Sequence, residues 1–222
     1  HSLEDNALDL VSDGTAQVET APFYGIYMPD GIAAQSINGK TYLFTANEGD
    51  ATEWSEGETA RYNNSTVAAV KGQLSPDSPA SQFLQDKTDY DALEVATDWG
   101  NDSIYLYGAR SFSIWDGDSL LDAQEQALTP VYDSGSDFEI ITSQRVPDFY
   151  NVSNSKVKMD DRSVKKGPEP EDIKTGVVGN HVLAFIGLER VGGFMTYDVS
   201  NPSEPLFANY TNTRQYLNDE GK

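Results

Sequence analysis

The sequence has no cysteine among its 222 residues and only two histidines, His1 and His181. Without thiols the chain has no disulfide, no thiolate nucleophile and no cysteine-ligated zinc site, although this does not decide its compartment. A Ser-His-Asp hydrolase needs a histidine base and usually a G-x-S-x-G elbow, and a zinc phosphatase needs several histidine ligands. His181 falls in an expected hairpin turn, where we interpret it as a surface residue. These familiar hydrolytic centres are therefore not expected.

Basic residues are scarce as well. The 15 Lys and Arg stand against 36 Asp and Glu, which gives a formal net charge of -21. Such a charge repels a phosphate backbone and attracts cations, so nucleic acid is not an expected partner. No apolar run approaches the roughly 20 residues of a membrane-spanning helix, and residues 1–3 do not resemble the start of a signal peptide, so any targeting segment is expected to precede them. Hydrophobic residues still make up 38% of the chain, enough for a folded core.

What the sequence does contain is an internal repeat. A short Pro-acidic motif that starts at Pro29 recurs at Pro170, 141 positions later, and the same spacing relates Glu48 to Glu189. Further along, residues 111–116 resemble residues 193–198 at a spacing of 82 positions. The fall in spacing indicates that the first copy carries about 59 extra residues between its second and third strands.

Each copy is expected to contain four β-strands, because runs of β-branched and aromatic residues alternate with turn residues. In the first copy the strands are residues 31–37, 41–46, 112–116 and 131–133; in the second they are 171–178, 182–187, 194–199 and 206–210. Asn38-Gly39 joins the first two strands and is the dipeptide that most favours a two-residue hairpin turn. Four short antiparallel strands per copy are typical of a propeller blade.

We therefore predict an all-β fold of two β-propeller-type blades within a single module, residues 1–222. The first blade covers residues 29–139 with an insertion at about 51–109, and the second covers 171–210. The insertion is expected to lie outside the blade, with short helices at residues 80–84 and 90–96. Together with the charged connection 143–170, it either shapes a binding surface or has no functional role.

Five segments carry a resemblance to a known family, namely residues 27–33, 45–50, 108–116, 167–171 and 185–193. Through these motifs the chain resembles the choice-of-anchor I family, which is related to the mesenchyme-specific cell-surface glycoproteins of biomineralising cells. The resemblance spans about residues 21–214. It implies a secreted or surface-anchored propeller-like protein that is extracellular, periplasmic or on the cell surface. Relatives are often labelled alkaline-phosphatase-like and sometimes lie beside a nucleotidase domain.

The chain departs from the family pattern at Glu171-Asp172-Ile173, where relatives carry an acidic residue and glycine after the second Pro-Glu. Relatives also continue with further blades, so we expect this chain to be part of a larger propeller. Two isolated blades leave two strand edges unpaired. Self-association through these edges is therefore expected.

The repeat places carboxylates at matching positions, where we expect them to face a shared axis. The candidate metal ligands are Asp30, Glu48, Asp50, Glu171 and Glu189. A divalent cation, Ca²⁺ or Mg²⁺, would relieve the repulsion between them.

Alternatively, these carboxylates accept backbone hydrogen bonds or pair with Arg110 and Arg190, which are otherwise candidate ligand-binding residues. Residues 133–139 also alternate oxygen-bearing side chains and form a further candidate cation loop, without EF-hand spacing.

Three functions are compatible with these patterns. The first is a non-catalytic binding or scaffold propeller for an unknown ligand or surface polymer, with a possible dependence on a divalent cation. The second is a metal-dependent phosphoesterase, which would hold two cations about 4 Å apart. The third is a purely structural surface or biomineral-associated protein.

Overall fold

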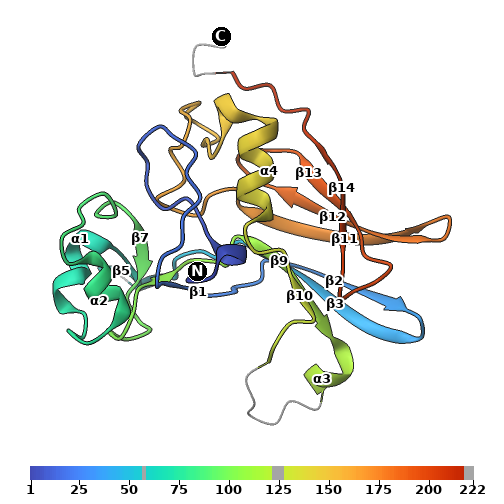
Figure 1. The fold of residues 1–222 in the computed structure, drawn as a ribbon, viewed down its shortest axis with the longest axis horizontal. Helices are drawn as coiled ribbons and strands as arrows, with labels where there is room; N and C mark the ends of the chain where they lie inside the picture. The colour runs from blue at the N-terminus through green and yellow to red at the C-terminus, as the bar shows by residue number, and fades with distance from the viewer. Residues whose placement is uncertain (57–58, 122–127, 218–222) are drawn as a thin grey trace.

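The computed structural model describes residues 1–56, 59–121 and 128–217. Two four-stranded antiparallel sheets lie on one side of the molecule, and a smaller unit of short helices and strand pairs lies on the other (Figure 1). The coarse expectation is confirmed, since the protein is mostly β with four-stranded antiparallel sheets. Within the described residues the two sheets do not close into a ring.

The first sheet has the order β10-β9-β3-β2. Its strands are β2 (Gly31–Ile37), β3 (Lys40–Asn47), β9 (Ser111–Asp116) and β10 (Tyr132–Asp133). Asn38 and Gly39 adopt φ values of 54° and 82° between β2 and β3. These are the left-handed conformations that a type I′ turn requires, so the turn prediction is confirmed.

The second sheet has the order β11-β12-β13-β14. Its strands are β11 (Pro170–Val178), β12 (His181–Leu188), β13 (Phe194–Asp198) and β14 (Leu206–Thr211). Gly179, with φ of 63°, begins the turn between β11 and β12. All four strands agree with the expected boundaries to within one residue.

Strand registers in the two sheets obey both repeat spacings. Phe44 pairs with Ile114 in the first sheet, and Phe185 pairs with Thr196 in the second. Phe185 follows Phe44 by 141 positions and Thr196 follows Ile114 by 82, the two spacings that the sequence shows. Every pair from Tyr42 and Asp116 through Ala46 and Phe112 maps onto a β12–β13 pair in the same way. The two sheets therefore have the same internal construction.

A single hydrophobic core lies between the sheets. The ring centroid of Phe112 on β9 lies 4.8 Å from that of Tyr197 on β13 and 6.1 Å from that of Phe138. Phe138 belongs to helix α4 (Asp137–Arg145), which follows β10 and precedes the short 3-10 helix η3 (Pro147–Phe149). The hydroxyl of Tyr197 donates to Asp137 at 2.8 Å, which fixes the start of α4 to the second sheet.

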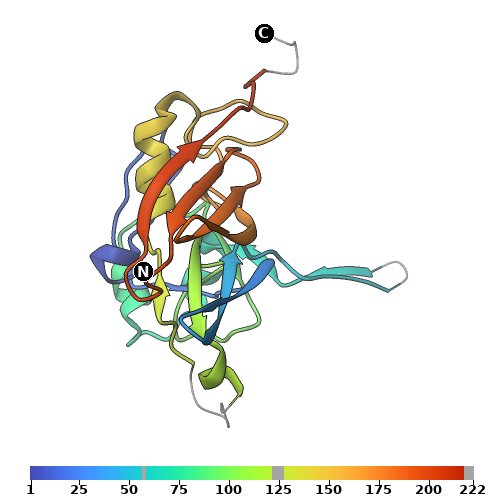
Figure 2. The ribbon, with the colours of Figure 1, turned by 90° about the vertical axis from the view of Figure 1, so that its right-hand side faces the viewer.

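The insertion contributes no strand to either four-stranded sheet in its described part. It begins with a hairpin, β4 (Glu53–Glu56) and β5 (Thr59–Tyr62), which projects from the molecule in Figure 2. The remainder contains β6 (Asn64–Thr66), α1 (Val67–Val70), η2 (Lys71–Gln73), α2 (Pro79–Leu84), β7 (Glu94–Ala96) and β8 (Tyr105–Leu106). Helix α3 (Gly117–Leu121) follows β9.

The insertion and the N-terminal segment together build a second core. The segment carries η1 (Glu4–Asn6) and β1 (Tyr24–Gly25), and β1 pairs with β8. The buried residues of this core are Leu8, Leu10, Ala21, Phe23, Val67, Leu74, Ala80, Leu84, Tyr90, Leu93, Val95, Ile104 and Leu106. The sequence did not predict this core, because the composition of the insertion is polar.

Of the two helices expected in the insertion, the one at residues 80–84 is confirmed by α2. The one at 90–96 is wrong, because residues 94–96 form β7 and pair with β6. Burial of Val95 beside that partner strand outweighs the local preference. No helix among the described residues is long and apolar enough to cross a bilayer.

Phe112 and Phe194 occupy equivalent repeat positions in different environments, which provides a matched pair for mutation. Phe112 is fully buried between the sheets, whereas Phe194 is 41% exposed. We expect Phe112→Ala to lower the free energy of unfolding by about 3–5 kcal/mol, because it leaves a core cavity. Phe194→Ala should cost about 1 kcal/mol or less. Urea unfolding of both variants measures the difference, and equal costs would contradict the shared core.

Candidate functional site

Two of the predicted carboxylates meet where the sheets adjoin. Glu48 directly follows β3 and Glu189 directly follows β12, which are equivalent strands. One carboxylate oxygen of each lies within 4.8 Å of the other and of an oxygen of Glu169, just before β11. We call Glu48, Glu169 and Glu189 the seam cluster. Glu48 and Glu169 are buried, and Glu189 is half-buried.

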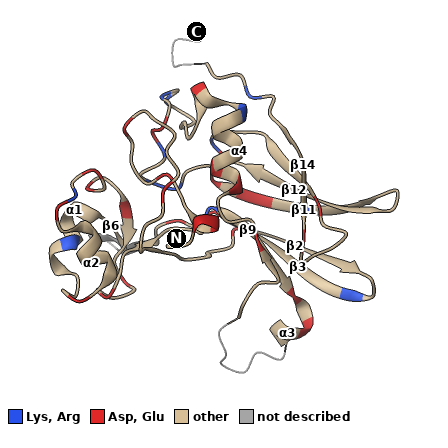
Figure 3. Cartoon of the chain, viewed as in Figure 1, with Lys and Arg blue, Asp and Glu red and all other residues tan. Residues whose placement is uncertain are grey.

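Glu169 was missed as a candidate ligand. It lies directly before β11, and the residue 141 positions earlier is Met28, which has no carboxylate, so the repeat gave no signal for Glu169. It belongs to the segment 167–171, which carries the family resemblance but did not indicate a ligand role. Figure 3 shows acidic residues at the start of β11 and in the first turn of α4.

Three cationic side chains contact the seam cluster. Lys166 Nζ lies 2.5 Å from Glu48 Oε1, and Arg162 Nη2 lies 2.5 Å from Glu169 Oε1. Arg190 donates from Nε to Glu169, and this nitrogen lies 3.2 Å from Glu189 Oε2. Three carboxylates thus face three cations. Arg190 therefore pairs with the carboxylates, which is one of the two roles expected for it; the other was ligand binding.

Burial changes the protonation of the seam cluster. It raises the pKa of Glu169 to about 7, assisted by a hydrogen bond with Glu189, while Arg162, Lys166 and Arg190 act in the opposite direction. Burial also raises the pKa of Glu48, against the effect of its bond with Lys166. Burial by itself would lower the pKa of Lys166, but the bond to Glu48 and the nearby carboxylates raise it overall. Near neutral pH, Glu169 is therefore partly protonated.

The other three predicted ligands lie at the solvent side of the seam. Asp30 and Glu171 are exposed, and the Asp50 side chain is 80% exposed with Oδ2 at 3.4 Å from Lys166 Nζ. The pKa of Glu171 is raised by partial burial and then by the charges of Glu189 and Asp30. Five predicted carboxylates therefore share one region, although only Glu48 and Glu189 belong to the close cluster.

Arg110, the other predicted ligand-binding residue, lies in the interior. It is fully buried with φ of 56°, and Nη1 donates to Glu139 Oε1 at 3.0 Å and to the Asp9 carbonyl at 2.9 Å. Its Nη2 donates to the carbonyls of Ser163 and Lys165 at 2.9 and 2.7 Å. Its ion pair is thus with Glu139, and it holds the connection that carries Lys166.

The candidate cation loop at residues 133–139 is occupied by hydrogen bonds within the protein. Asp133 Oδ2 accepts from the hydroxyls of Ser111 and Ser113 at 2.9 and 2.6 Å. Its Oδ1 accepts from the Gly135 backbone at 2.8 Å, and α4 begins at Asp137. These contacts fix the start of α4 against the first sheet.

Comparison with known proteins places the chain in a protein family. The model of the choice-of-anchor I domain matches residues 1–202 of the chain. The chain belongs to the choice-of-anchor I family. Gigasin-3a from Magallana gigas is 32% identical over 120 residues, which is 49% of this chain and 39% of Gigasin-3a. No solved structure matches significantly. Family membership agrees with a secreted or surface module.

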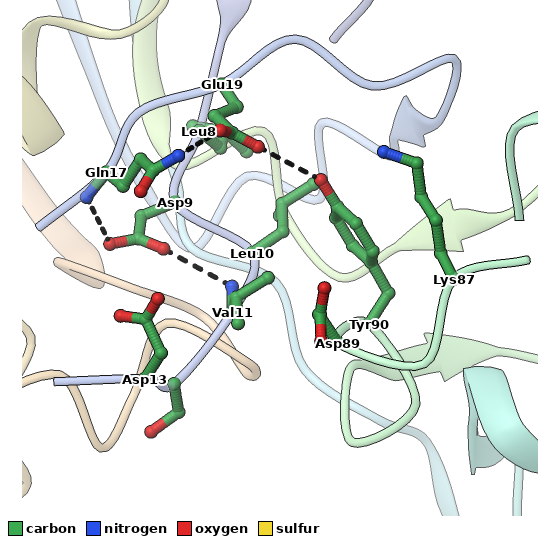
Figure 4. Close-up of a pocket in the computed structure, with 11 residues that line it drawn as sticks. Leu8, Asp9, Leu10, Val11, Asp13, Gln17, Glu19, Lys87, Asp89 and Tyr90 are labelled. Atoms are coloured by element: carbon green, nitrogen blue, oxygen red, sulfur yellow. Dashed lines mark hydrogen bonds between the residues drawn. The ribbon is translucent and has the colours of Figure 1, made fainter. Parts of the chain in front are cut away.

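The choice-of-anchor I domain also has an acidic pocket away from the seam, with a volume of about 610 Å³ (Figure 4). The N-terminal segment and the insertion form it together, and its charged lining residues are Asp9, Asp13, Glu19, Lys87 and Asp89. Asp9 is 1% exposed, and its carboxylate accepts from the backbone of Gln17 at 2.9 Å and of Val11 at 3.3 Å. Burial raises the pKa of Asp9 to about 7.

The raised pKa of Asp9 predicts that the stability of the domain depends on pH. Between pH 4 and 7 the folded domain binds a proton at Asp9 that the unfolded chain has lost, so the free energy of unfolding falls as pH rises through this window. Asp9→Asn removes the ionisable group and should be stabilising relative to the natural chain at pH 8, with a smaller benefit at pH 5. Urea unfolding across this range measures the effect.

Asp89→Asn is the control, because it removes one charge from an exposed position on the same pocket. It should shift stability with a weaker dependence on pH. If Asp9→Asn and the natural chain lose stability in parallel from pH 5 to 8, the carboxyl of Asp9 titrates normally.

Proposed function

We propose that this domain is a non-catalytic binding or scaffold module built from β-propeller blades, acting in a secreted or surface-bound protein. In this proposal the seam cluster holds one divalent cation, Ca²⁺ or Mg²⁺, and presents it to a ligand or surface polymer. The observation that carries the proposal is the meeting of the repeat-equivalent residues Glu48 and Glu189 with Glu169 where the two sheets adjoin.

Stacking of the sheets supports the propeller part. Their first strands, β2 and β11, lie against each other, and a Cβ atom added at Gly31 would lie 2.6 Å from the Cα atom of Asp172. In a propeller the first strands of successive blades surround the central axis. Equivalent glutamates beside those strands would then recur around the axis.

The donor set fits a hard cation. Carboxylate oxygens bind Ca²⁺ at roughly 2.3–2.6 Å, so two ligand oxygens on opposite sides of the ion are about 5 Å apart. The oxygens of the seam cluster lie within 4.8 Å of one another. An ion would replace the contacts of Lys166 and Arg190 with the same carboxylates. It would also compete with the proton on Glu169, so binding should strengthen as pH rises through 7 and level off once Glu169 is fully ionised.

A binding function is favoured over phosphoester hydrolysis, because the described residues offer side-chain ligands for one metal ion and a two-metal hydrolase needs ligands for two. A two-metal hydrolase holds two ions about 4 Å apart and keeps coordination positions open for substrate. Among the residues that the structure describes, one group of three potential ligands lies close enough to hold an ion. Its members also pair with Lys166, Arg162 and Arg190. This arrangement suits a structural or bridging ion.

Calcium should raise the melting temperature beyond the effect of a monovalent salt at equal ionic strength. An ion that binds the folded state contributes about 2.7 kcal/mol when its free concentration is a hundred times its Kd. Glu48→Gln and Glu189→Gln keep the side-chain shape and remove a ligand charge, so each should abolish the excess. Thermal unfolding in CaCl₂ and in matched NaCl provides the measurement.

The matched control is Glu204→Gln, which changes an exposed glutamate in the turn before β14. It should retain the full calcium increment. An increment that is absent in the natural chain, or that survives both seam variants, would show that these carboxylates serve only to pair with Lys166 and Arg190.

A further inference from the structure

The insertion carries a groove that shares no residue with the seam cluster or the acidic pocket. Its volume is about 410 Å³, which is within the range of roughly 300–1,000 Å³ typical of ligand pockets. The lining comes from β6, α1, η2 and the chain from the end of β7 toward β8, all in the smaller unit of the molecule (Figure 1). The groove is therefore a further place at which the domain can hold a ligand.

The polar lining of the groove is uncharged. None of its described lining residues is acidic or basic, and the polar ones are Ser65, Gln73, Thr97, Asn101 and Ser103. Gln73 and Asn101 each donate one side-chain N–H to a backbone carbonyl, at 3.0 and 3.2 Å. Their amide oxygens accept no hydrogen bond from the described residues, so both oxygens are available to a hydroxyl donor.

Three aromatic side chains form a row beside this groove. Tyr24 and Tyr105 are partners in the parallel pair β1–β8, and their ring centroids lie 5.7 Å apart with the planes inclined by 22°. The ring of Trp99 lies 6.0 Å from that of Tyr105, at an angle of 34°. Trp99 directly precedes Gly100 and Tyr105 directly follows Ile104, both of which line the groove. The row and the groove therefore share one short segment of the chain.

The aromatic row is open to solvent and held in position. Tyr24 is 60% exposed and Trp99 is 55% exposed, and the hydroxyl of Tyr105 donates to Asp102 Oδ1 at 3.0 Å. Aromatic side chains gain stability by burial, so a group of them on the surface indicates an interaction site. Because a hydrogen bond already fixes the middle ring, a ligand that contacts the row orders few additional groups.

Ring faces beside uncharged polar groups suit a neutral sugar. The C–H bonds on the face of a sugar ring pack against the negative face of an aromatic ring, while the sugar hydroxyls need hydrogen-bond partners. A charged ligand would be buried in the groove without a charged partner, which is costly. The net charge of -21 would in addition repel an anionic polymer. A purely apolar ligand would leave the amide and hydroxyl groups of the groove unpaired.

We infer that the groove and the aromatic row together bind a neutral polysaccharide. One sugar unit enters the groove and forms hydrogen bonds with Gln73 and Asn101, and neighbouring units of the same polymer stack on Trp99 and Tyr24. The inference goes beyond the proposed function, because it assigns a second site, on the insertion, to which the seam cluster and its cation contribute nothing.

Affinity electrophoresis in native gels tests the inference, because a polymer cast into the gel retards a protein that binds it. The neutral polymers are hydroxyethylcellulose, xyloglucan, galactomannan and dextran. Carboxymethylcellulose is the matched anionic polymer, since it has the same backbone as hydroxyethylcellulose. We expect at least one neutral polymer to retard the natural chain and carboxymethylcellulose to leave its migration unchanged. All gels contain EDTA, so failure of this site is distinguishable from failure of the calcium proposal.

Two variants separate the row from the groove. Trp99→Ala removes one end of the row, and we expect it to weaken polymer binding about tenfold or more, since aromatic side chains carry much of the energy of an interface. Asn101→Ala removes an amide from the groove and should weaken binding several-fold. Both residues are exposed, so both variants should fold, which circular dichroism checks. The control is Phe194→Ala, which removes an aromatic ring that is 41% exposed on β13 and should leave binding unchanged.

The inference is wrong if no neutral polymer retards the chain, if carboxymethylcellulose retards it as strongly as hydroxyethylcellulose does, or if Trp99→Ala binds as tightly as the natural chain. Polylysine in the gel tests the competing occupant, a basic protein segment, because a cation also binds to aromatic faces. Retardation by polylysine that Trp99→Ala abolishes, together with none by the neutral polymers, would assign the row to such a segment and overturn the inference.

Discussion

The contact between the first strands of the two sheets is the constraint on which the other features depend. Gly31 on β2 leaves no room for a side chain beside Asp172 on β11. Because the first strands touch, the two sheets share one core and the ends of β3 and β12 lie together. Glu48 and Glu189 therefore meet as a consequence of packing. Their charges, with that of Glu169, are then balanced by Lys166, Arg162 and Arg190.

A second buried ion pair holds those cations in place. Arg110 and Glu139 are both inaccessible to solvent, and Arg110 also bonds the carbonyls of Ser163 and Lys165. Removing one partner of such a pair leaves an uncompensated buried charge, which typically costs about 3–5 kcal/mol. The connection that supplies Arg162 and Lys166 is thus fixed from the interior. Charge balance at the seam depends on this second, deeper pair.

Local pattern and repetition made much of the fold predictable. Strand periodicity and the Asn38-Gly39 turn act over a few residues, and the two spacings located Glu48 and Glu189 at equivalent positions. Glu169 stands where the first copy has Met28, and Lys166 precedes the start of the second copy, so only the tertiary structure brings these two charges to the seam. The second core joins the N-terminal segment to the insertion across long sequence separations, which local periodicity does not report. The strand β7 replaced an expected helix for the same reason.

The central claim is that repeat stacking brings Glu48 and Glu189 into one cluster. A double-mutant cycle in calcium-free buffer tests it most directly, using urea unfolding of Glu48→Gln, Glu189→Gln and the double variant. Each single change relieves the same repulsion, which the double change can relieve only once. The double variant should therefore have a free energy of unfolding about 0.5–3 kcal/mol lower than the value obtained by adding the two single changes to that of the natural chain. Effects that add to within about 0.3 kcal/mol would contradict the account, because they would show that the two carboxylates do not interact.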